Sequence, residues 1–437
     1  MTKRVLIMGA AGKDFHVFNT VYRGRTDVRV ECFTATQIPG IDGRKYPTEL
    51  AGPEYPEGIP IEDEADLESL IKNREIDHVV FAYSDVSYDY VEGKRKLVEA
   101  AGATFEESPV DETMIKSTKP VIAICAVRTG CGKSQTTRKV AEILKDMGKK
   151  VVAIRHPMPY GDLAKQAVQR FASVDDLKKH ECTIEEMEEY EPHITTGTII
   201  YAGVDYEAIV REAEKEADVI LWDGGNNDIP FYKPDLWITV ADPHRPGHEL
   251  SYYPGKVNAE RAGVIVMNKM DSAKADDVKT VEANLKKLNP NATVIYANSP
   301  VSVTDASVIE GKRVLVVEDG PTLTHGGMKY GAGVVAAQKF GAREIVDPRP
   351  FLVGELAATF EKYPEIGQIL PAMGYGDKQM ADLQATIEKA DVEAVVIGTP
   401  IDLGRVIKID KPNTRVTYDL DDYSDPSLGR VIGELLS

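Results

Sequence analysis

The sequence KPVIAICAVRTGCGKSQTTRKVAEILKDM, residues 119–147, decides the fold of this chain. It opens with an apolar run, residues 121–127, of the length of a buried β-strand. After a short loop, apolar residues recur at the spacing of one buried helix face, at Val140, Ile143, Leu144 and Met147. A glycine-bearing turn from strand to helix points consecutive backbone N–H groups at one spot, where the helix dipole favours negative charge. The stretch therefore predicts a phosphate-binding loop.

The loop reads Arg128-Thr129-Gly130-Cys131-Gly132-Lys133-Ser134. Lys133 can neutralise β- and γ-phosphate oxygens, and the hydroxyl of Ser134 can hold Mg²⁺. Val127 stands where G-x-x-x-x-G-K-[ST] has its first glycine, so the string instead resembles the deviant KGGxGK[ST] loop of SIMIBI-class proteins, with Arg128 in the signature-lysine position. We predict catalytic roles for Lys133 and Arg128. We expect nucleotide contacts from Thr129, Gly130, Cys131, Gly132, Lys133, Ser134 and Gln135.

Composition limits the classes of function. The chain has 437 residues, enough for two or three domains, with 43% hydrophobic and 28% charged residues, as in water-soluble globular proteins. A net charge of −18 argues against general binding to nucleic acid or anionic membranes. Four cysteines without a C-x-x-C pair, no signal-peptide pattern and no membrane-length apolar run favour a reduced, cytoplasmic setting.

Residues 1–115 predict a Rossmann-like domain. A strand over residues 4–8 leads into Gly9-Ala10-Ala11-Gly12, and further strands are expected over residues 28–33 and 78–83. The second strand ends in Phe33-Thr34-Ala35-Thr36, without the acidic residue that would hold a ribose. We therefore expect no redox cofactor here; a pocket for a small anion or nucleotide at the glycines is the alternative.

Residues 116–310 predict a SIMIBI-like P-loop domain built on a parallel sheet. The strand over residues 218–222 ends in Asp223, followed by two glycines, which is the Walker B pattern. We predict that Asp223 is catalytic and shares Mg²⁺ with Ser134. Residues 181–191 carry six glutamates, which is typical of a solvated helix face.

Basic side chains follow two further strands of this sheet. Arg155 and His156 come after the strand at residues 149–154, and His244, Arg245 and His248 follow the strand at residues 236–241. Ligands bind at the carboxyl edge of such sheets. On an acidic chain, these side chains indicate a local site for an anionic substrate.

A base-binding pattern follows the strand at residues 263–267. Asn268, Lys269 and Asp271 have the NKxD arrangement that binds guanine, and Asn298 lies in the expected companion loop. These residues favour GTP. However, ATP-using SIMIBI enzymes also place an asparagine here, so both nucleotides stay open.

Residues 311–437 predict a C-terminal α/β segment. After a strand at residues 313–317, hydroxyl, histidine and glycine residues form a second candidate anion site, at Thr324, His325 and Gly326. The whole chain is thus predicted as an α/β protein of three parts.

Seven stretches resemble the archaeal cyclic 2,3-diphosphoglycerate synthetases over nearly the whole chain: GAAGKDFHVFN, TGCGKS, RHPMPYGDL, WDGGNND, ADPHRPGHE, NKMD and EDGPTLTHGGM. The resemblance implies ATP- and Mg²⁺-dependent closure of 2,3-diphosphoglycerate into an intramolecular phosphoanhydride, with release of ADP and phosphate. It implies a small polyanionic substrate held by Arg155, His156, His244, Arg245, His248, Thr324, His325 and Gly326. As in SIMIBI relatives, a homodimer is expected, with Arg128 acting across its interface.

Two alternatives remain on the sequence alone. A GTP-binding switch or metallochaperone would use the NKxD pattern, whereas the basic loops and the additional domains favour an enzyme. A P-loop kinase or ligase acting on another small acid fits the same residues. Phosphate release that depends on a small acid would separate an enzyme from a switch.

Overall fold

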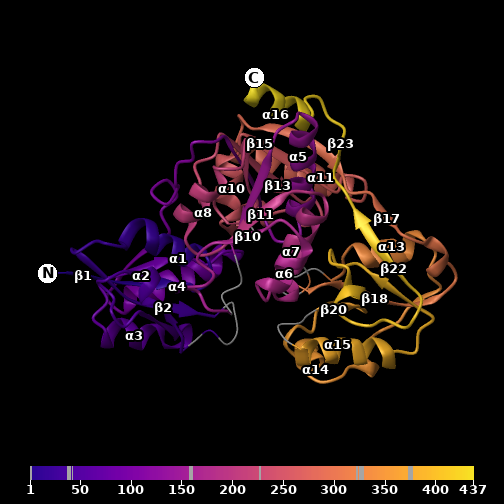
Figure 1. Ribbon diagram of the computed structural model, residues 1–437, viewed down its shortest axis with the longest axis horizontal. Helices are drawn as coiled ribbons and strands as arrows, with labels where there is room; N and C mark the ends of the chain where they lie inside the picture. Colours follow the sequence, from indigo (N-terminus) through magenta and orange to yellow (C-terminus); the bar gives the residue numbers. More distant parts are fainter. Residues whose placement is uncertain are drawn as a thin grey trace.

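The computed structural model is a mixed α/β protein built on three largely parallel sheets (Figure 1). None of the described helices is long and apolar enough to cross a lipid bilayer. The structure describes residues 2–36, 41, 43–156, 161–225, 228–320, 323, 329–372 and 377–437.

The N-terminal sheet has the strand order β3-β4-β2-β1-β5-β7. Every neighbouring pair except β3–β4 is parallel, so these strands end at one edge. Its strands are β1 (Lys3–Met8), β2 (Val28–Ala35), β3 (Lys45–Tyr46), β4 (Ile59–Asp63), β5 (His78–Phe81) and β7 (Thr104–Glu107). Its helices include α1 (Lys13–Val17), α2 (Thr48–Ala51), α3 (Leu67–Asn73) and α4 (Tyr88–Ala100).

The central sheet has the order β10-β11-β9-β12-β8-β13-β15-β16-β23, and only its two edge strands are antiparallel to their neighbours. All six residues of β8 are buried, as expected of a parallel strand covered on both faces. Its strands are β8 (Val121–Ala126), β9 (Val151–Arg155), β10 (Gln169–Phe171), β11 (Ile199–Ala202), β12 (Val219–Trp222), β13 (Leu236–Ala241), β15 (Val264–Met267), β16 (Thr293–Asn298) and β23 (Asp421–Asp422).

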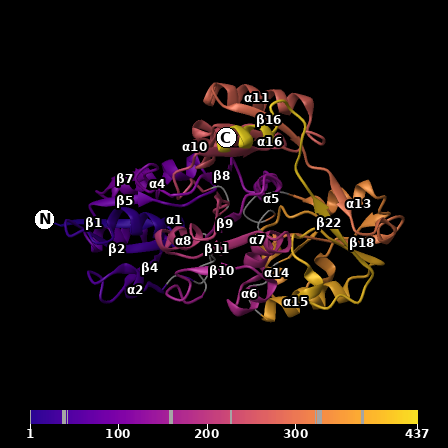
Figure 2. The same cartoon turned by 45° about the horizontal axis from the view of Figure 1, so that its top comes forward.

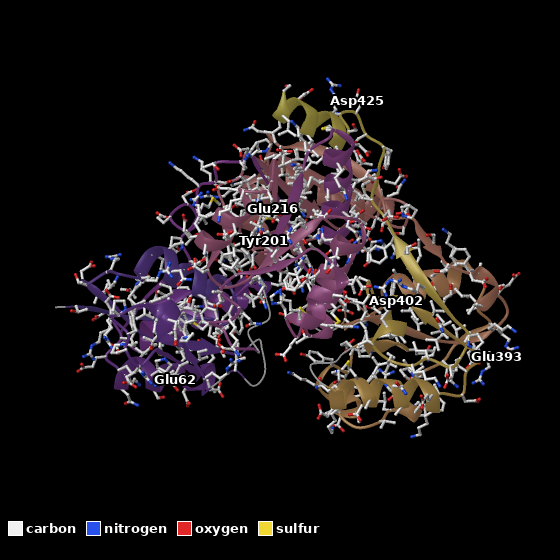
Figure 3. All side chains as sticks on the ribbon, viewed as in Figure 1. Glu62, Tyr201, Glu216, Glu393, Asp402 and Asp425 are labelled. Carbon is white, nitrogen blue, oxygen red and sulfur yellow. The ribbon has the colours of Figure 1, made fainter. Side chains whose placement is uncertain are left out.

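Helices cover both faces of this sheet. The helix after β8, α5, runs over Lys133–Asp146 and buries its apolar side chains in the main core. The others are α6 (Val174–Lys179), α7 (Ile184–Thr195), α8 (Tyr206–Ala213), α9 (His248–Ser251), α10 (Gly255–Arg261) and α11 (Ala275–Leu288). On β11, the strand next to the edge strand β10, Tyr201 lies close to Glu216 (Figure 3), and its hydroxyl donates to Glu216 over 2.6 Å.

The third sheet has the order β17-β22-β21-β18-β19, with β20 also paired to β18. Its strands are β17 (Val301–Val303), β18 (Arg313–Asp319), β19 (Glu344–Ile345), β20 (Leu370–Ala372), β21 (Ala394–Ile397) and β22 (Asn413–Tyr418). Its helices include α13 (Ala332–Lys339), α14 (Leu356–Lys362) and α15 (Asp377–Lys389).

The end of the chain leaves the third sheet and returns to the central one. Strand β23 pairs with β16, and α16 (Leu428–Leu436) packs beside α5 (Figure 2). Leu428 and Ile432 of α16 are fully buried in the central core. The predicted α/β class with parallel sheets is confirmed; the domain ranges 1–115, 116–310 and 311–437 stay a prediction.

The docking of α16 gives a stability prediction. We expect Ile432→Ala to destabilise the protein by about 2–5 kcal/mol, because it removes buried apolar surface and leaves a cavity. The exposed Glu434→Ala, on the same helix, should change stability by less than about 0.5 kcal/mol. Urea unfolding midpoints of the two variants measure the difference, and equal midpoints would show that α16 is not docked.

Candidate active site

The predicted phosphate-binding loop joins β8 to α5. Gly130 and Gly132 have φ angles of +82° and +106°, in the left-handed region that favours glycine. A Cβ atom on Gly132 would lie 2.0 Å from the side-chain nitrogen of Asn268, so no larger residue fits. The loop is thus held in one shape directly before a 14-residue helix, the geometry of an anion-binding turn.

Asp223, at the end of β12, is the centre of a buried polar network. Its Oδ1 accepts hydrogen bonds from Lys133 Nζ over 2.9 Å and Thr137 Oγ1 over 2.6 Å. Its Oδ2 accepts from Arg155 Nη1 over 2.6 Å and from His193 Nε2 over 3.0 Å. The Asp223 side chain is fully buried, so the network compensates a charge that has lost its water.

The charges in this network shift the pKa values of its members. Burial opposes ionisation of Asp223, but Arg155 and Lys133 outweigh it and hold the pKa of the carboxyl well below its usual value. Burial, with the charge of Arg155 added, lowers the pKa of Lys133. The three charged groups are therefore coupled, and loss of one changes the other two.

The predicted magnesium ligands fit the site only in part. Ser134 is the second residue of α5, as required, but both carboxylate oxygens of Asp223 already accept hydrogen bonds. Direct binding of Mg²⁺ by Asp223 would require one of these donors to withdraw. Among the residues that the structure describes, no group of three His, Cys, Asp or Glu side chains is arranged as a metal site.

The carboxyl edge of the N-terminal sheet faces this site. A Cβ atom on Gly12 would lie 3.0 Å from the ring of His156, and His156 Nε2 lies 2.9 Å from Asp228 Oδ2. The hydroxyl of Ser84, after β5, donates to the same Asp228. Because both parallel sheets present their carboxyl ends here, loops from the two units form one interface.

A short ribbon joins the two units beside this interface. Strand β6 (Val86–Ser87) pairs antiparallel with β14 (Tyr252–Tyr253). Lys13, which is buried, donates from Nζ to the hydroxyl of Tyr253 over 3.1 Å. The GAAGKD loop after β1 is thus fixed against the central unit.

Arg128 lies at the same interface and is 5% exposed. Its Nε donates to Asp85 Oδ1 over 2.7 Å, and its guanidinium carbon lies 3.6 Å from the centre of the Tyr252 ring. Its Nη1 lies 3.0 Å from Nδ1 of His248. Burial, followed by the charge of Arg128, lowers the pKa of His248 to about 4, so its neutral ring accepts this bond at pH 7. These partners all belong to the same chain.

The NKxD residues brace the loop in this structure. Lys269 Nζ donates to the Gly130 carbonyl over 2.7 Å and to Asp242 Oδ2 over 2.9 Å. The side-chain nitrogen of Asn268 donates to the Cys131 carbonyl over 3.0 Å. Contacts with a base are therefore not the only function that fits these two residues.

The remaining base and substrate candidates are spread around the same edge. Asp271 Oδ1 accepts from the backbone N–H of Ser299 over 3.0 Å, and Asn298 ends β16. Arg245 Nη2 lies 3.3 Å from Cys131 Sγ, whereas His244 bonds to Ser272 over 3.0 Å, away from the Asp223 network. The predicted Thr324, His325 and Gly326 lie outside the described residues.

Helix α7 connects the network to the third sheet. Glu189 pairs with Arg155 over 2.7 Å, while Glu188 accepts from Thr399 Oγ1 over 2.5 Å. Glu191 pairs with Arg405 over 3.1 Å. The expectation of a solvated glutamate face is wrong for Glu188 and Glu191, which are buried, because the third unit covers them.

No protein-family model matches the chain. A curated relative, "Arginine synthetase ArcE" of Thermococcus kodakarensis, is 62% identical over 432 residues, covering 99% of this chain and 96% of the relative. The chain belongs to the arginine synthetase family.

The expected membership in the cyclic 2,3-diphosphoglycerate synthetases is therefore wrong. The "Cyclic 2,3-diphosphoglycerate synthetase" of Methanothermus fervidus is 25% identical over 158 residues, which are 34% of this chain and 32% of that protein. The expectation that this chain acts on 2,3-diphosphoglycerate is therefore also wrong, because the chain belongs to the arginine synthetase family. The motifs behind it describe phosphate-binding loops, which do not by themselves identify the acceptor.

Among solved structures, the chain is similar to LpxK of Aquifex aeolicus, crystallised in complex with ATP. That likeness covers 85% of this arginine synthetase family member and all of the LpxK chain, at 12% identity and a TM-score of 0.46. These values are too low to support an inference.

Asp14 in the GAAGKD loop gives this family member a testable pH dependence. Burial raises the pKa of Asp14 from 3.8 to about 6, against hydrogen bonds from the backbone of Ala11 and Phe15. Folding therefore favours the protonated carboxyl. As pH rises from about 4 to above 6, ionisation of Asp14 should remove about 3 kcal/mol of stability.

Asp14→Asn should remove this contribution. Its stability relative to the wild type should rise by up to about 3 kcal/mol between pH 4 and pH 7. The exposed Asp66→Asn, in the same unit, provides the control. A stability difference for Asp14→Asn that stays constant with pH in urea unfolding would contradict the raised pKa.

Proposed function

We propose that the protein synthesises arginine, driven by a nucleoside triphosphate, with ATP as the first candidate. The observation that carries this proposal is the 62% identity to an arginine synthetase over 99% of the chain. The turn before Lys133, with its buried positive charges, supports the use of a nucleotide. The proposal replaces only the acceptor in the scheme expected from the sequence, not the phosphoryl transfer.

Chemistry restricts the acceptor. Arginine ends in a guanidinium group, and the corresponding ureido acid, citrulline, has oxygen in place of one terminal nitrogen. That oxygen is a poor leaving group until it is phosphorylated. We therefore propose that the ureido oxygen attacks the γ-phosphorus, so that a new O–P bond forms, the β–γ bridge breaks and ADP leaves.

A nitrogen nucleophile completes the reaction. Its lone pair forms a C–N bond to the activated carbon, and the C–O bond then breaks, so that phosphate leaves with the oxygen. Ammonia is the simplest nucleophile that gives arginine itself, because any larger amine would leave a substituent to be removed. The sum is citrulline, ammonia and ATP giving arginine, ADP and phosphate.

Residues of this chain would supply positioning and charge neutralisation. Lys133, Arg155 and Arg128 place three positive charges around the loop, each on a side chain with under a tenth of its surface exposed. Buried charges act strongly on a developing phosphoryl charge because little water screens them. Ser134 would hold Mg²⁺, and Asp223 would join it once one of its hydrogen-bond donors withdraws; the bound ion would offset charge on the β- and γ-oxygens.

The N-terminal unit would shield the acceptor-binding part of the site from water. Its loops at Gly12, Ser84 and Asp85 contact the central unit at His156, Asp228 and Arg128. Exclusion of water there would favour attack by the acceptor over hydrolysis of the nucleotide. The Rossmann-like unit would thus act in acceptor binding, and needs no redox cofactor.

Arginine formation should require both citrulline and ammonium. We expect wild-type protein with Mg²⁺, ATP, citrulline and ammonium to form arginine and phosphate in equal amounts. Omission of either nitrogen compound should suppress phosphate release, and GTP in place of ATP measures the nucleotide preference. A rate of nucleotide hydrolysis that does not depend on citrulline would instead support a GTP- or ATP-driven switch.

Lys133 provides a mutational prediction. Lys133→Ala should lower kcat by about 100-fold or more, since a buried donor to the transferred phosphoryl group is lost. Lys139→Ala, on the same helix, removes a partly exposed lysine that pairs with Glu142 and should leave the rate nearly unchanged. Similar rates for the two variants would refute the role of the loop.

A further inference from the structure

Asp85 directly precedes β6, the short strand that pairs with β14, and it combines a strained backbone with a buried side chain. It has a φ of +59°, a left-handed conformation that a non-glycine side chain rarely adopts. Its side chain is 3% exposed. A backbone conformation of this kind is found mostly where function requires it.

The two carboxylate oxygens of Asp85 differ. Oδ1 accepts the hydrogen bond from Arg128, whereas Oδ2 is buried without a hydrogen-bond partner among the described residues. A buried acceptor left unsatisfied has lost the hydrogen bonds of water without replacement, which is unfavourable. Thr129 Oγ1, in the adjoining loop residue, is likewise buried and unsatisfied in the described chain. A ligand that donates hydrogen bonds would satisfy the Asp85 oxygen.

The surroundings restrict that ligand. Arg128 holds Asp85 beside the predicted phosphate-binding loop, to which Lys133 also belongs, so a ligand at Oδ2 would lie close to that loop. A phosphate oxygen is excluded as a partner of Oδ2, because two anionic acceptors repel. A small cation rich in N–H groups suits a buried carboxylate oxygen.

We propose that Asp85 binds ammonium and takes up one of its protons as the nitrogen attacks. This assignment rests on the proposed synthesis of arginine. One N–H bond breaks toward Oδ2, and the freed lone pair forms the C–N bond. The nitrogen then loses a second proton to water as the C–O bond breaks, and the first proton passes from Asp85 to the departing phosphate. Arg128 keeps the carboxylate oriented by holding its other oxygen.

The test compares two nucleophiles with Asp85→Asn. At pH 7 ammonium must lose a proton before it can attack, whereas hydroxylamine is mostly uncharged and already has its lone pair. We expect Asp85→Asn to lower kcat/KM for ammonium by about 100-fold, the usual contribution of a general base. The value for hydroxylamine and the KM for citrulline should change by less than about threefold.

Controls separate this role from a structural one. Asp89→Asn, an exposed acid at the start of α4, should behave as the wild type. Asp85→Asn should retain the thermal stabilisation by ADP, which reports an intact loop. Asp85→Glu keeps a carboxylate and should recover part of the rate of arginine formation from ammonium. This variant still tests the role of the carboxylate if Asp85→Asn does not fold.

Three results would overturn the assignment. Equal losses with both nucleophiles, or a loss of ADP stabilisation, would mean that Asp85 acts only through Arg128. A raised KM for citrulline would place the amino acid at Oδ2. If the wild type forms arginine and Asp85→Asn does so at the same rate with ammonium, only the role of Asp85 is overturned. If the wild type forms no arginine, the proposed function itself is overturned.

Discussion

The buried carboxylate of Asp223 constrains the whole site. A carboxylate without water needs partners on both oxygens, and four side chains provide them from α5, β9 and α7. These contacts fix Lys133 and Arg155 beside the glycine-bearing turn between β8 and α5. They also fix α7, whose other glutamates bind the third unit. One buried charge thus orients three elements relative to the loop.

The second organising feature is the meeting of two sheet edges. The carboxyl edge of a parallel sheet is where such folds bind ligands, and here two of these edges face each other. A nucleotide on the central edge would leave the N-terminal edge for the acceptor. In the proposed function, the N-terminal unit would therefore bind the acceptor rather than a redox cofactor.

Much of the fold could be predicted from local patterns. The apolar run before Arg128, the glycine turn and the strand that ends in Asp223 are short-range signals, and the structure brings Lys133, Arg155 and Asp223 together. Their chemical roles stay predictions. Thr137 could have been predicted as well, because it lies one helical turn after Lys133, on the same face.

Other features had no local signal. His193 and Asp85 reach the site only through the packing of α7 and of the N-terminal unit, and the return of α16 to the central sheet depends on long-range contacts. The acceptor was mispredicted for a related reason. Loops that bind phosphate look alike whatever group receives it, so resemblance of those loops led to the wrong substrate.

In the proposed reaction, the nucleotide's phosphoryl group is transferred to the ureido oxygen of the acceptor. Citrulline labelled with ¹⁸O in its ureido group tests this most directly, with the released phosphate analysed by mass spectrometry after turnover with ATP and ammonium. If the ureido oxygen is phosphorylated, we expect one ¹⁸O atom in each phosphate released. Unlabelled phosphate accompanying arginine formation would contradict it, because the oxygen would then have left by a route that does not involve phosphorylation.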